Sequence, residues 1–159
     1  MAMRRTGDWV KVGALIGNLS KEMSRASKLS LKRFGLKLEG TAKKHISNQD
    51  LNWVPLKAKT VARKIRKGYS ENILVETSDY FQAITSYVKK DTVYVGVKKD
   101  VTSRDGDIVH SIAAVHEFGS GAIPARPLWQ PSFDETVKWH IANNSPVDIF
   151  AKRIKKYYK

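Results

Sequence analysis

The chain has no cysteine among its 159 residues, which excludes a disulfide framework and any metal site built on thiolates. It also has no apolar run approaching the roughly 20 residues that a membrane-spanning helix needs. The stretch at 10–19 follows two arginines, but Lys11, Gly13, Gly17 and Asn18 interrupt it, so it lacks the pattern of an export signal. We therefore expect a protein without a membrane partner that is assembled in a reducing cytoplasm.

Proline is scarce, with five residues in the whole chain. Three of them are crowded into one short segment: Pro124, Pro127 and Pro131. Their spacing is incompatible with a regular helix or an inner strand, and it predicts an extended, proline-rich arm at 119–131. The residues that precede these prolines should be extended: Ile123, Arg126 and Gln130. A helix should follow the arm, opened by a capping box of Ser132 and Glu135.

Acidic residues are rare in the first part of the chain. Residues 1–70 carry 17 Lys and Arg against 4 Asp and Glu, a net charge of +13, whereas residues 71–159 carry 12 against 11, a net charge of +1. Such one-sided basicity indicates a polyanionic partner, either DNA or an acidic protein ring, although lysines that only keep helix faces soluble would give the same composition. The candidate basic face consists of Lys32, Arg33, Lys43, Lys44, Lys57, Arg63, Lys64, Arg66 and Lys67.

Catalytic patterns are missing as well. His116 and Glu117 look like the start of a zinc motif, but Ser120 stands where that motif needs its second histidine. No nucleophile elbow, phosphate-binding loop or paired-carboxylate metal site is visible, so we expect no enzyme, no metal and no cofactor. Glu117 has a better structural interpretation, because a carboxylate nine residues before Arg126 could form an ion pair that pins the arm to the core.

Helical periodicity dominates residues 9–46, after a flexible tail at 1–8. Its two apolar stripes are Val12, Ile16, Leu19, Met23 and Ala26, followed by Leu31, Phe34, Leu38, Ala42 and Ile46. Because residues 24–30 have weak helix propensity, we expect either two helices or one long helix with a bend. The basic block at 56–67 is either a short amphipathic helix with Val61 and Ile65 inward, or a mobile loop that becomes ordered on a partner.

The second half of the chain alternates short elements. Residues 77–79 resemble a helix N-cap, with Tyr80, Phe81 and Ile84 as the buried face that follows. Residues 85–97 predict a β-hairpin with its turn at 89–92, and a last basic helix is expected at 147–158. The sum is a single α+β domain over 1–159, with N-terminal helices, a small antiparallel sheet containing the hairpin, short helices and a C-terminal basic helix.

Two blocks of sequence suggest a family. One is His116-Glu-Phe-Gly followed by Ile123-Pro-Ala-Arg-Pro. The other is Trp53-Val-Pro-Leu-Lys-Ala-Lys-Thr, then Ala62-Arg-Lys and Ile73-Leu-Val-Glu-Thr. In their order along the chain, from the Trp53 block to the His116 block over residues 53–131, they resemble the signature of bacteriophage virion-morphogenesis proteins, the small tail-completion and neck proteins of Mu-like and lambdoid long-tailed phages. The resemblance also implies a short helix at 108–118.

The resemblance implies a structural virion protein, assembled in the host cytoplasm, that forms a ring in the neck and joins the head connector to the tail. Its partners would be copies of itself in a hexameric or dodecameric ring, the connector or adaptor, tail-tube or terminator proteins, and packaged DNA through non-specific contacts. One alternative is a tail terminator that caps the tail tube, and another is a basic, non-specific DNA-binding protein that acts off the particle. The interface candidates are Trp53, Pro55, Leu56, His116, Glu117, Phe118, Gly119, Pro124, Arg126, Pro127 and Trp129.

Overall fold

The computed structural model describes residues 7–155, with the exception of the side chains of Lys11, Val12 and Leu15. Most of the tail expected at 1–8 and the end of the helix expected at 147–158 therefore lie outside the described residues, as does the side chain of Val12 in the first stripe. The elements are α1 Trp9–Asn48, α2 Ala58–Arg66, α3 Asp79–Ala83, β1 Ile84–Lys89, β2 Thr92–Val97, α4 Val109–Phe118, α5 Trp129–Asn143 and α6 Pro146–Ile154. This mixture of helices with an antiparallel pair of strands confirms the α+β prediction.

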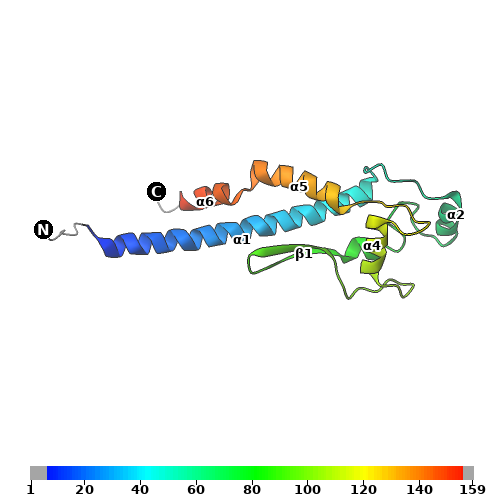
Figure 1. The fold of residues 1–159 in the computed structure, drawn as a ribbon, viewed down its shortest axis with the longest axis horizontal. Coiled ribbons are helices and arrows are strands. Elements are labelled where there is room, and N and C mark those ends of the chain that lie inside the picture. Colours follow the sequence, from blue (N-terminus) through cyan, green and yellow to red (C-terminus); the bar gives the residue numbers. More distant parts are fainter. Residues whose placement is uncertain (1–6, 156–159) are drawn as a thin grey trace.

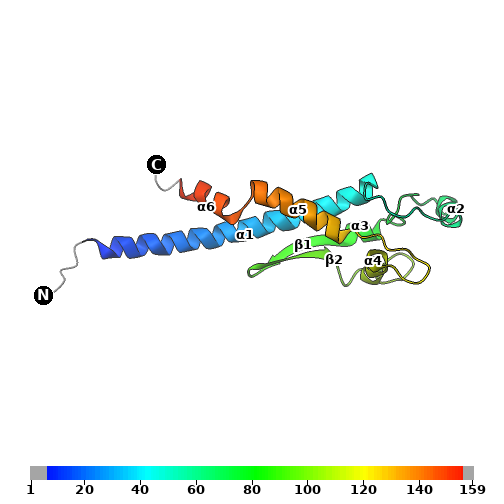
Figure 2. The ribbon, with the colours of Figure 1, turned by 45° about the horizontal axis from the view of Figure 1, so that its top comes forward.

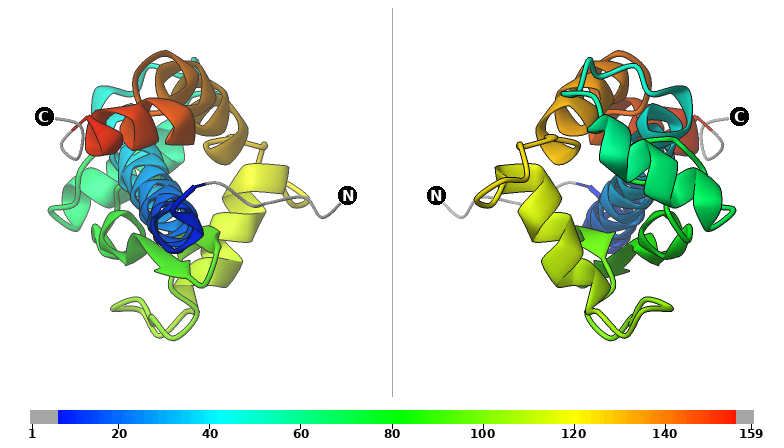
Figure 3. Two further views of the ribbon diagram at one scale, coloured as in Figure 1. Left: turned by 90° about the vertical axis from the view of Figure 1, so that its left-hand side faces the viewer. Right: turned by 90° about the vertical axis from the view of Figure 1, so that its right-hand side faces the viewer.

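Helix α1 is the longest element, and the other elements pack along it or near its C-terminal end (Figure 1). Helices α5 and α6 run along one side of it and the β1–β2 hairpin along another, whereas α2, α3 and α4 gather around its C-terminal end (Figure 2). Seen along the axis, α1 lies in the middle with the other elements arranged around it (Figure 3). The first turns of α1 extend past the end of α6. The sequence left open two helices or a bend, and the structure has one continuous helix of 40 residues.

Tertiary packing explains why α1 continues through its weak segment. Ser30 is buried, and its hydroxyl donates a hydrogen bond to the carbonyl oxygen of Asn144 at 2.9 Å. The Nη1 of Arg33 donates to the side-chain oxygen of the same Asn144 at 2.8 Å. Nearer the N-terminus of α1, Glu22 accepts a hydrogen bond from Arg153 of α6 at 2.6 Å. Contacts with α5 and α6 therefore compensate for the low helix propensity of residues 24–30.

The hairpin rests on α1 at Gly35. A Cβ atom at this position would lie 2.6 Å from Cγ2 of Val93 and 3.3 Å from Cβ of Ser86, which is closer than packed atoms allow. Ser86 also donates a hydrogen bond to Glu39, one turn farther along the helix, at 2.8 Å. The absence of a side chain at Gly35 thus permits the close approach of the sheet to the helix.

Gly35→Ala is expected to destabilise the fold, although alanine is the better helix former by about 1 kcal/mol. Val93 is β-branched and cannot easily move away, so the added methyl group overpacks the contact. Gly40→Ala is the matched control, because Gly40 is in the same helix and no atom lies within 4 Å of its Cβ position. Urea denaturation should separate the two variants by about 1–3 kcal/mol, with Gly40→Ala the more stable. Equal stabilities would contradict the close contact.

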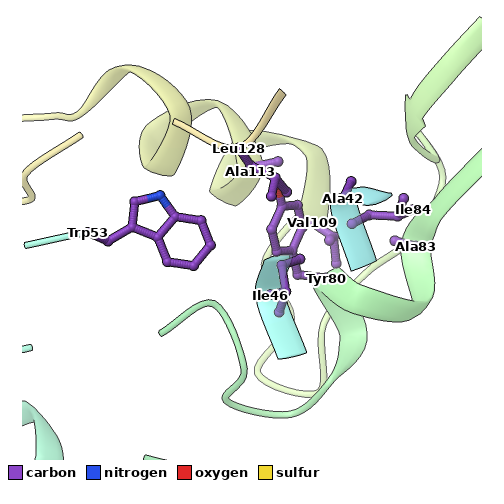
Figure 4. Packing of buried hydrophobic residues seen from close by; sticks show 9 residues of the cluster. All are labelled: Ala42, Ile46, Trp53, Tyr80, Ala83, Ile84, Val109, Ala113 and Leu128. Atoms are coloured by element: carbon purple, nitrogen blue, oxygen red, sulfur yellow. The ribbon is translucent and has the colours of Figure 1, made fainter. Parts of the chain in front are cut away.

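The hydrophobic core lies at the C-terminal end of α1 (Figure 4). Tyr80 of α3 stands at its centre, with side chains from α1 on one side and from α4 on the other. The buried residues of this cluster are Ala42, Ile46, Trp53, Tyr80, Ala83, Ile84, Val109, Ala113 and Leu128. Since the core joins α1, α3, α4 and the end of the proline-rich arm, it fixes the position of the arm relative to α1.

Local predictions for the second half are confirmed in most elements. The strands pair antiparallel from Ile84 with Val97 to Lys89 with Thr92, so the hairpin turn is at Lys90 and Asp91. Helix α4 covers almost all of the expected 108–118. Helix α6 begins at Pro146, with the Ser145 hydroxyl capping the amide of Asp148. Proline is favourable in this first position because its missing N–H has no partner there.

The start of α5 was predicted wrongly. The helix begins at Trp129, so Gln130 is helical and not extended, and the arm ends near Leu128. Pro131 occupies the third helical position, where a backbone N–H has no partner within the helix and its loss costs little. Ser132 forms no capping box, because its hydroxyl lies inside the helix and donates to the carbonyl oxygen of Leu128 at 2.7 Å.

Candidate interaction site

The two blocks that carry the family resemblance lie against each other. The indole Nε1 of Trp53 donates a hydrogen bond to the carbonyl oxygen of Pro127 at 2.9 Å. The Nε of Arg126 donates to the carbonyl oxygen of Val54 at 3.2 Å. Segments that are far apart in the sequence therefore form one structural unit beside the core, with Trp53 and Arg126 buried and Pro127 exposed.

The proline-rich arm folds back on the end of α4. Ser120 and Ile123 exchange backbone hydrogen bonds of 3.0 and 2.8 Å around a tight turn. Gly119 has a φ of 78°, and a Cβ atom there would lie 3.0 Å from the amide nitrogen of Ala125. The Arg126 amide then donates to the carbonyl oxygen of His116 at 2.6 Å. Glycine is required at 119 because both the positive φ and the close backbone contact exclude a side chain.

Glu117 anchors the arm, but not through the ion pair with Arg126 that the sequence suggested. Its carboxylate accepts hydrogen bonds from the backbone amides of Leu128 at 2.8 Å and Trp129 at 3.2 Å. Among the described residues, no carboxylate lies within ion-pair distance of Arg126. The carboxylate of Glu117 instead satisfies the free amides and the positive dipole end of α5, which explains how this helix begins without a side-chain cap of its own.

The basic block forms helix α2, as the first of its two interpretations, a short amphipathic helix, predicted. Lys64 is buried, and its Nζ donates to the carbonyl oxygens of Asn72 at 2.6 Å and Val75 at 2.9 Å. Lys64 therefore takes the inward position that was predicted for Ile65, which is 55% exposed. The hydrogen bonds compensate for burying the ammonium group, although burial still lowers the pKa of Lys64.

A bidentate ion pair also connects α2 to the segment that follows it. The guanidinium of Arg63 donates to both carboxylate oxygens of Glu76, at 2.6 and 3.0 Å. These hydrogen bonds hold the pKa of the Glu76 carboxyl below its usual value. Arg63 and Lys64 are thus committed to contacts within the chain and do not belong to a free basic face.

A cavity of about 510 Å³ lies between α2, the 74–80 segment, α4 and the proline-rich arm. Its walls include apolar side chains such as Val54, Ile112 and Ile123, whereas Arg126 and His116 are among its polar lining. The Nδ1 atom of His116 is buried and has no hydrogen-bond partner among the described residues. Burial lowers the pKa of His116, and the nearby charges of Arg126 and Lys64 lower it further, so this imidazole is neutral at pH 7.

The remaining interface candidates are distributed around this cavity and the arm. Leu56 and Pro124 are half-buried in the cavity wall, and Pro55 is exposed on it. Trp129 is half-buried against the core, whereas Phe118 is 81% exposed. The exposed members of the candidate basic set are Lys32, Arg33, Lys44, Lys57, Arg66 and Lys67. Lys43 is half-buried in an ion pair with Glu39 at 2.7 Å, so the basic residues do not form one continuous free face.

The sequence reasoning missed a further surface, a row of large apolar side chains on the N-terminal half of α1. Trp9, Ile16 and Met23 are 59%, 61% and 37% exposed, respectively. Their spacing of seven residues places them on one face of the helix. That spacing is visible in the sequence, where Ile16 and Met23 belong to the first apolar stripe, but Trp9 was not included in that stripe.

In the described part of the chain, no group of three or more His, Asp or Glu side chains is placed to hold a metal ion. No helix within residues 7–155 is long and apolar enough to cross a bilayer. In comparisons with known proteins, no protein-family model, curated protein or solved structure matches the chain.

Proposed function

We propose that this chain is a structural subunit of a tailed-bacteriophage virion, a ring-forming neck or tail-completion protein that joins the head connector to the tail. The observation that carries the proposal is the exposed row of Trp9, Ile16 and Met23 on the N-terminal half of α1, whose first turns extend past the end of α6. Contiguous large apolar side chains on a projecting helix are typical of a surface that a partner covers. A second copy of the chain is the partner that a ring requires.

A complementary surface lies in the other half of the molecule. An open groove of about 770 Å³ runs between β2, α4 and α5. Its apolar lining includes Val97, Phe118 and Phe133, and the two phenylalanines are 81% and 46% exposed. Because the row and the groove are different surfaces at different ends of α1, a contact between them is head-to-tail. Repetition of such a contact closes into a ring when the rotation between neighbours permits it.

The family resemblance is the reason for choosing a virion ring over other ring-forming proteins. The two blocks that carry it are hydrogen-bonded to each other through Trp53 and Arg126, as expected of a shared structural signature. The role requires assembly surfaces and no catalytic residues. The exposed lysines and arginines suit a lumen through which DNA passes without being read, because attraction to phosphates is independent of sequence.

Sedimentation of the purified chain tests the ring directly. The wild type should form a closed oligomer, and Trp9→Ser with Ile16→Ser should reduce it to the monomer while the core at the C-terminal end of α1 stays folded. Asn18→Ser with Lys21→Ser is the matched control, since both residues are exposed polar positions in the same helix, and it should leave the oligomer intact. A wild type that stays monomeric at high concentration would refute the ring.

A salt titration separates the ring subunit from a DNA-binding protein that acts off the particle. An apolar interface should persist as salt is raised, whereas binding to duplex DNA should weaken steeply because counterions are released. Loss of the oligomer and of DNA binding at the same salt concentration would favour the off-particle alternative.

Electron microscopy of particles made without the protein tests its station in the virion. Full heads beside finished but separate tails would support the joining role. Tails of uncontrolled length would instead indicate the terminator, and normal joined particles would exclude both.

A further inference from the structure

Arg126 is a buried cation without a counterion in the part of the chain that the structure describes. It is 4% exposed and lines the cavity between α2, α4 and the arm. Its Nε donates to the carbonyl oxygen of Val54, which fixes the stem of the side chain. No hydrogen bond or ion pair from Nη1 or Nη2 to any described residue is present. Burial of this side chain weakens the hydration of its charge, and an anion in the cavity would compensate for that loss.

Among the other cations that line the cavity, Lys57 is exposed, and the two that are buried or half-buried already have partners, which makes Arg126 distinctive. Arg63 is paired with Glu76 through two hydrogen bonds, and Lys64 donates to two backbone carbonyls. His116 adds a buried Nδ1 that also has no partner among the described residues. Two polar groups on the same cavity wall therefore lack partners, and both are held in place by the backbone hydrogen bond from Arg126 to His116.

The surrounding charges decide which kind of anion fits. The cavity lining contains four basic residues, Lys57, Arg63, Lys64 and Arg126, and four acidic residues, Glu76, Asp79, Asp105 and Asp107. A doubly charged phosphate would be repelled by these carboxylates, whereas one carboxylate carries a single charge and matches the planar fork of a guanidinium. Apolar walls at Val54, Ile112 and Ile123 provide space for an aliphatic group beside the anion.

We propose that this cavity binds a carboxylate carried on an aliphatic segment of a partner polypeptide, with the free guanidinium nitrogens of Arg126 as its anchor. The carboxylate belongs to an acidic side chain or to a chain terminus, since both present the same two oxygens. The proposal goes beyond the ring assignment and does not depend on it, because the site would remain if the subunit proved monomeric.

Nuclear magnetic resonance of the full chain tests the site with small probes. Isovalerate should shift the Nε–Hε signal of Arg126 and the ring signals of His116 in a saturable way. Isovaleramide has nearly the same shape without the charge and should not shift these signals. Inorganic phosphate should bind more weakly than isovalerate. Equal shifts with the amide, tighter binding of phosphate, or no saturable shift at these signals would overturn the proposal.

Two capped peptides then distinguish the sources of the carboxylate. Acetyl-Leu-Glu-amide has only a side-chain carboxylate, and acetyl-Leu-Gln with a free C-terminus has only a terminal one. Saturable binding by either supports the proposal and identifies the source, whereas binding by neither overturns it.

Substitutions separate a specific anchor from general attraction. Arg126→Gln should weaken isovalerate binding by about tenfold or more, as expected for loss of a charge-assisted pair. Lys57→Gln removes the same charge from an exposed position in the cavity lining and should change binding by less than about twofold. Equal losses in the two variants would contradict the anchor. Should Arg126→Gln fail to fold, the wild-type titration still decides, because its shifts locate the bound probe.

Discussion

Trp53→Ala is expected to cost about 3–5 kcal/mol of unfolding free energy, enough to unfold a marginally stable domain. The indole is 8% exposed and belongs to the main core cluster, so its removal leaves a large void. The substitution also removes the hydrogen bond to the carbonyl oxygen of Pro127, which connects the Trp53 segment to the proline-rich arm. Urea denaturation followed by circular dichroism, at one fixed subunit concentration, measures the loss.

Trp53→Phe separates the two contributions of the indole. Phenylalanine keeps most of the apolar volume but cannot donate to Pro127, so we expect a smaller loss of about 1–2 kcal/mol. A loss for Trp53→Ala below about 1 kcal/mol would contradict the placement of this side chain in the core.

Lys64→Met should cost about 2–4 kcal/mol, although it replaces a buried charge by an apolar side chain of similar length. The ammonium group donates to the carbonyl oxygens of Asn72 and Val75. Methionine leaves the Val75 carbonyl without this donor and leaves Asn72 with a long hydrogen bond of 3.4 Å from the Val75 amide. Lys59→Met is the control, because Lys59 is exposed on the same helix, and it should stay within about 0.5 kcal/mol of the wild type. Equal stabilities of the two variants would contradict the bonded position of Lys64.

The pH dependence of stability gives an independent check on Lys64. Burial lowers its folded-state pKa below the ordinary 10.5, so the unfolded chain holds this proton more tightly than the folded protein does. Wild-type stability relative to Lys64→Met should therefore rise with pH between the lowered folded pKa and 10.5, and stay constant below that window. A falling difference in the same window would show that the ammonium group is not desolvated.

Local sequence signals predicted those elements whose limits are set by neighbouring residues. The hairpin follows from β-forming residues on both sides of Lys90 and Asp91, and the last helix, expected to begin at Val147, begins one residue earlier at Pro146. The start of α5 was missed because its cap is Glu117, a residue of another helix. A capping box beginning at Ser132 is a reasonable local pattern, but tertiary contacts decide the outcome.

The candidate site was predicted less well than the fold, because it depends on contacts between distant segments. The basic block at 56–67 gives no sign that Lys64 is buried while its neighbour Ile65 is exposed. The cavity has walls from several segments that no local pattern connects. By contrast, three closely spaced prolines predicted the arm itself. The sequence also pointed to Arg126 and Glu117 as residues that hold the arm, but it did not predict the hydrogen-bond partners of either side chain.

The projecting end of α1 has a consequence for the order of assembly. Its first turns contain Gly13 and Gly17, each of which lowers helix stability by about 1 kcal/mol relative to alanine. Few contacts from the rest of the chain compensate there, so a neighbour must contribute the free energy that keeps this end helical. Each single contact between subunits is therefore weak, and only closure of the full circle, in which every projecting end is held, makes assembly tight. Assembly of such a subunit should therefore depend steeply on its concentration, with monomers and closed rings populated and few open intermediates.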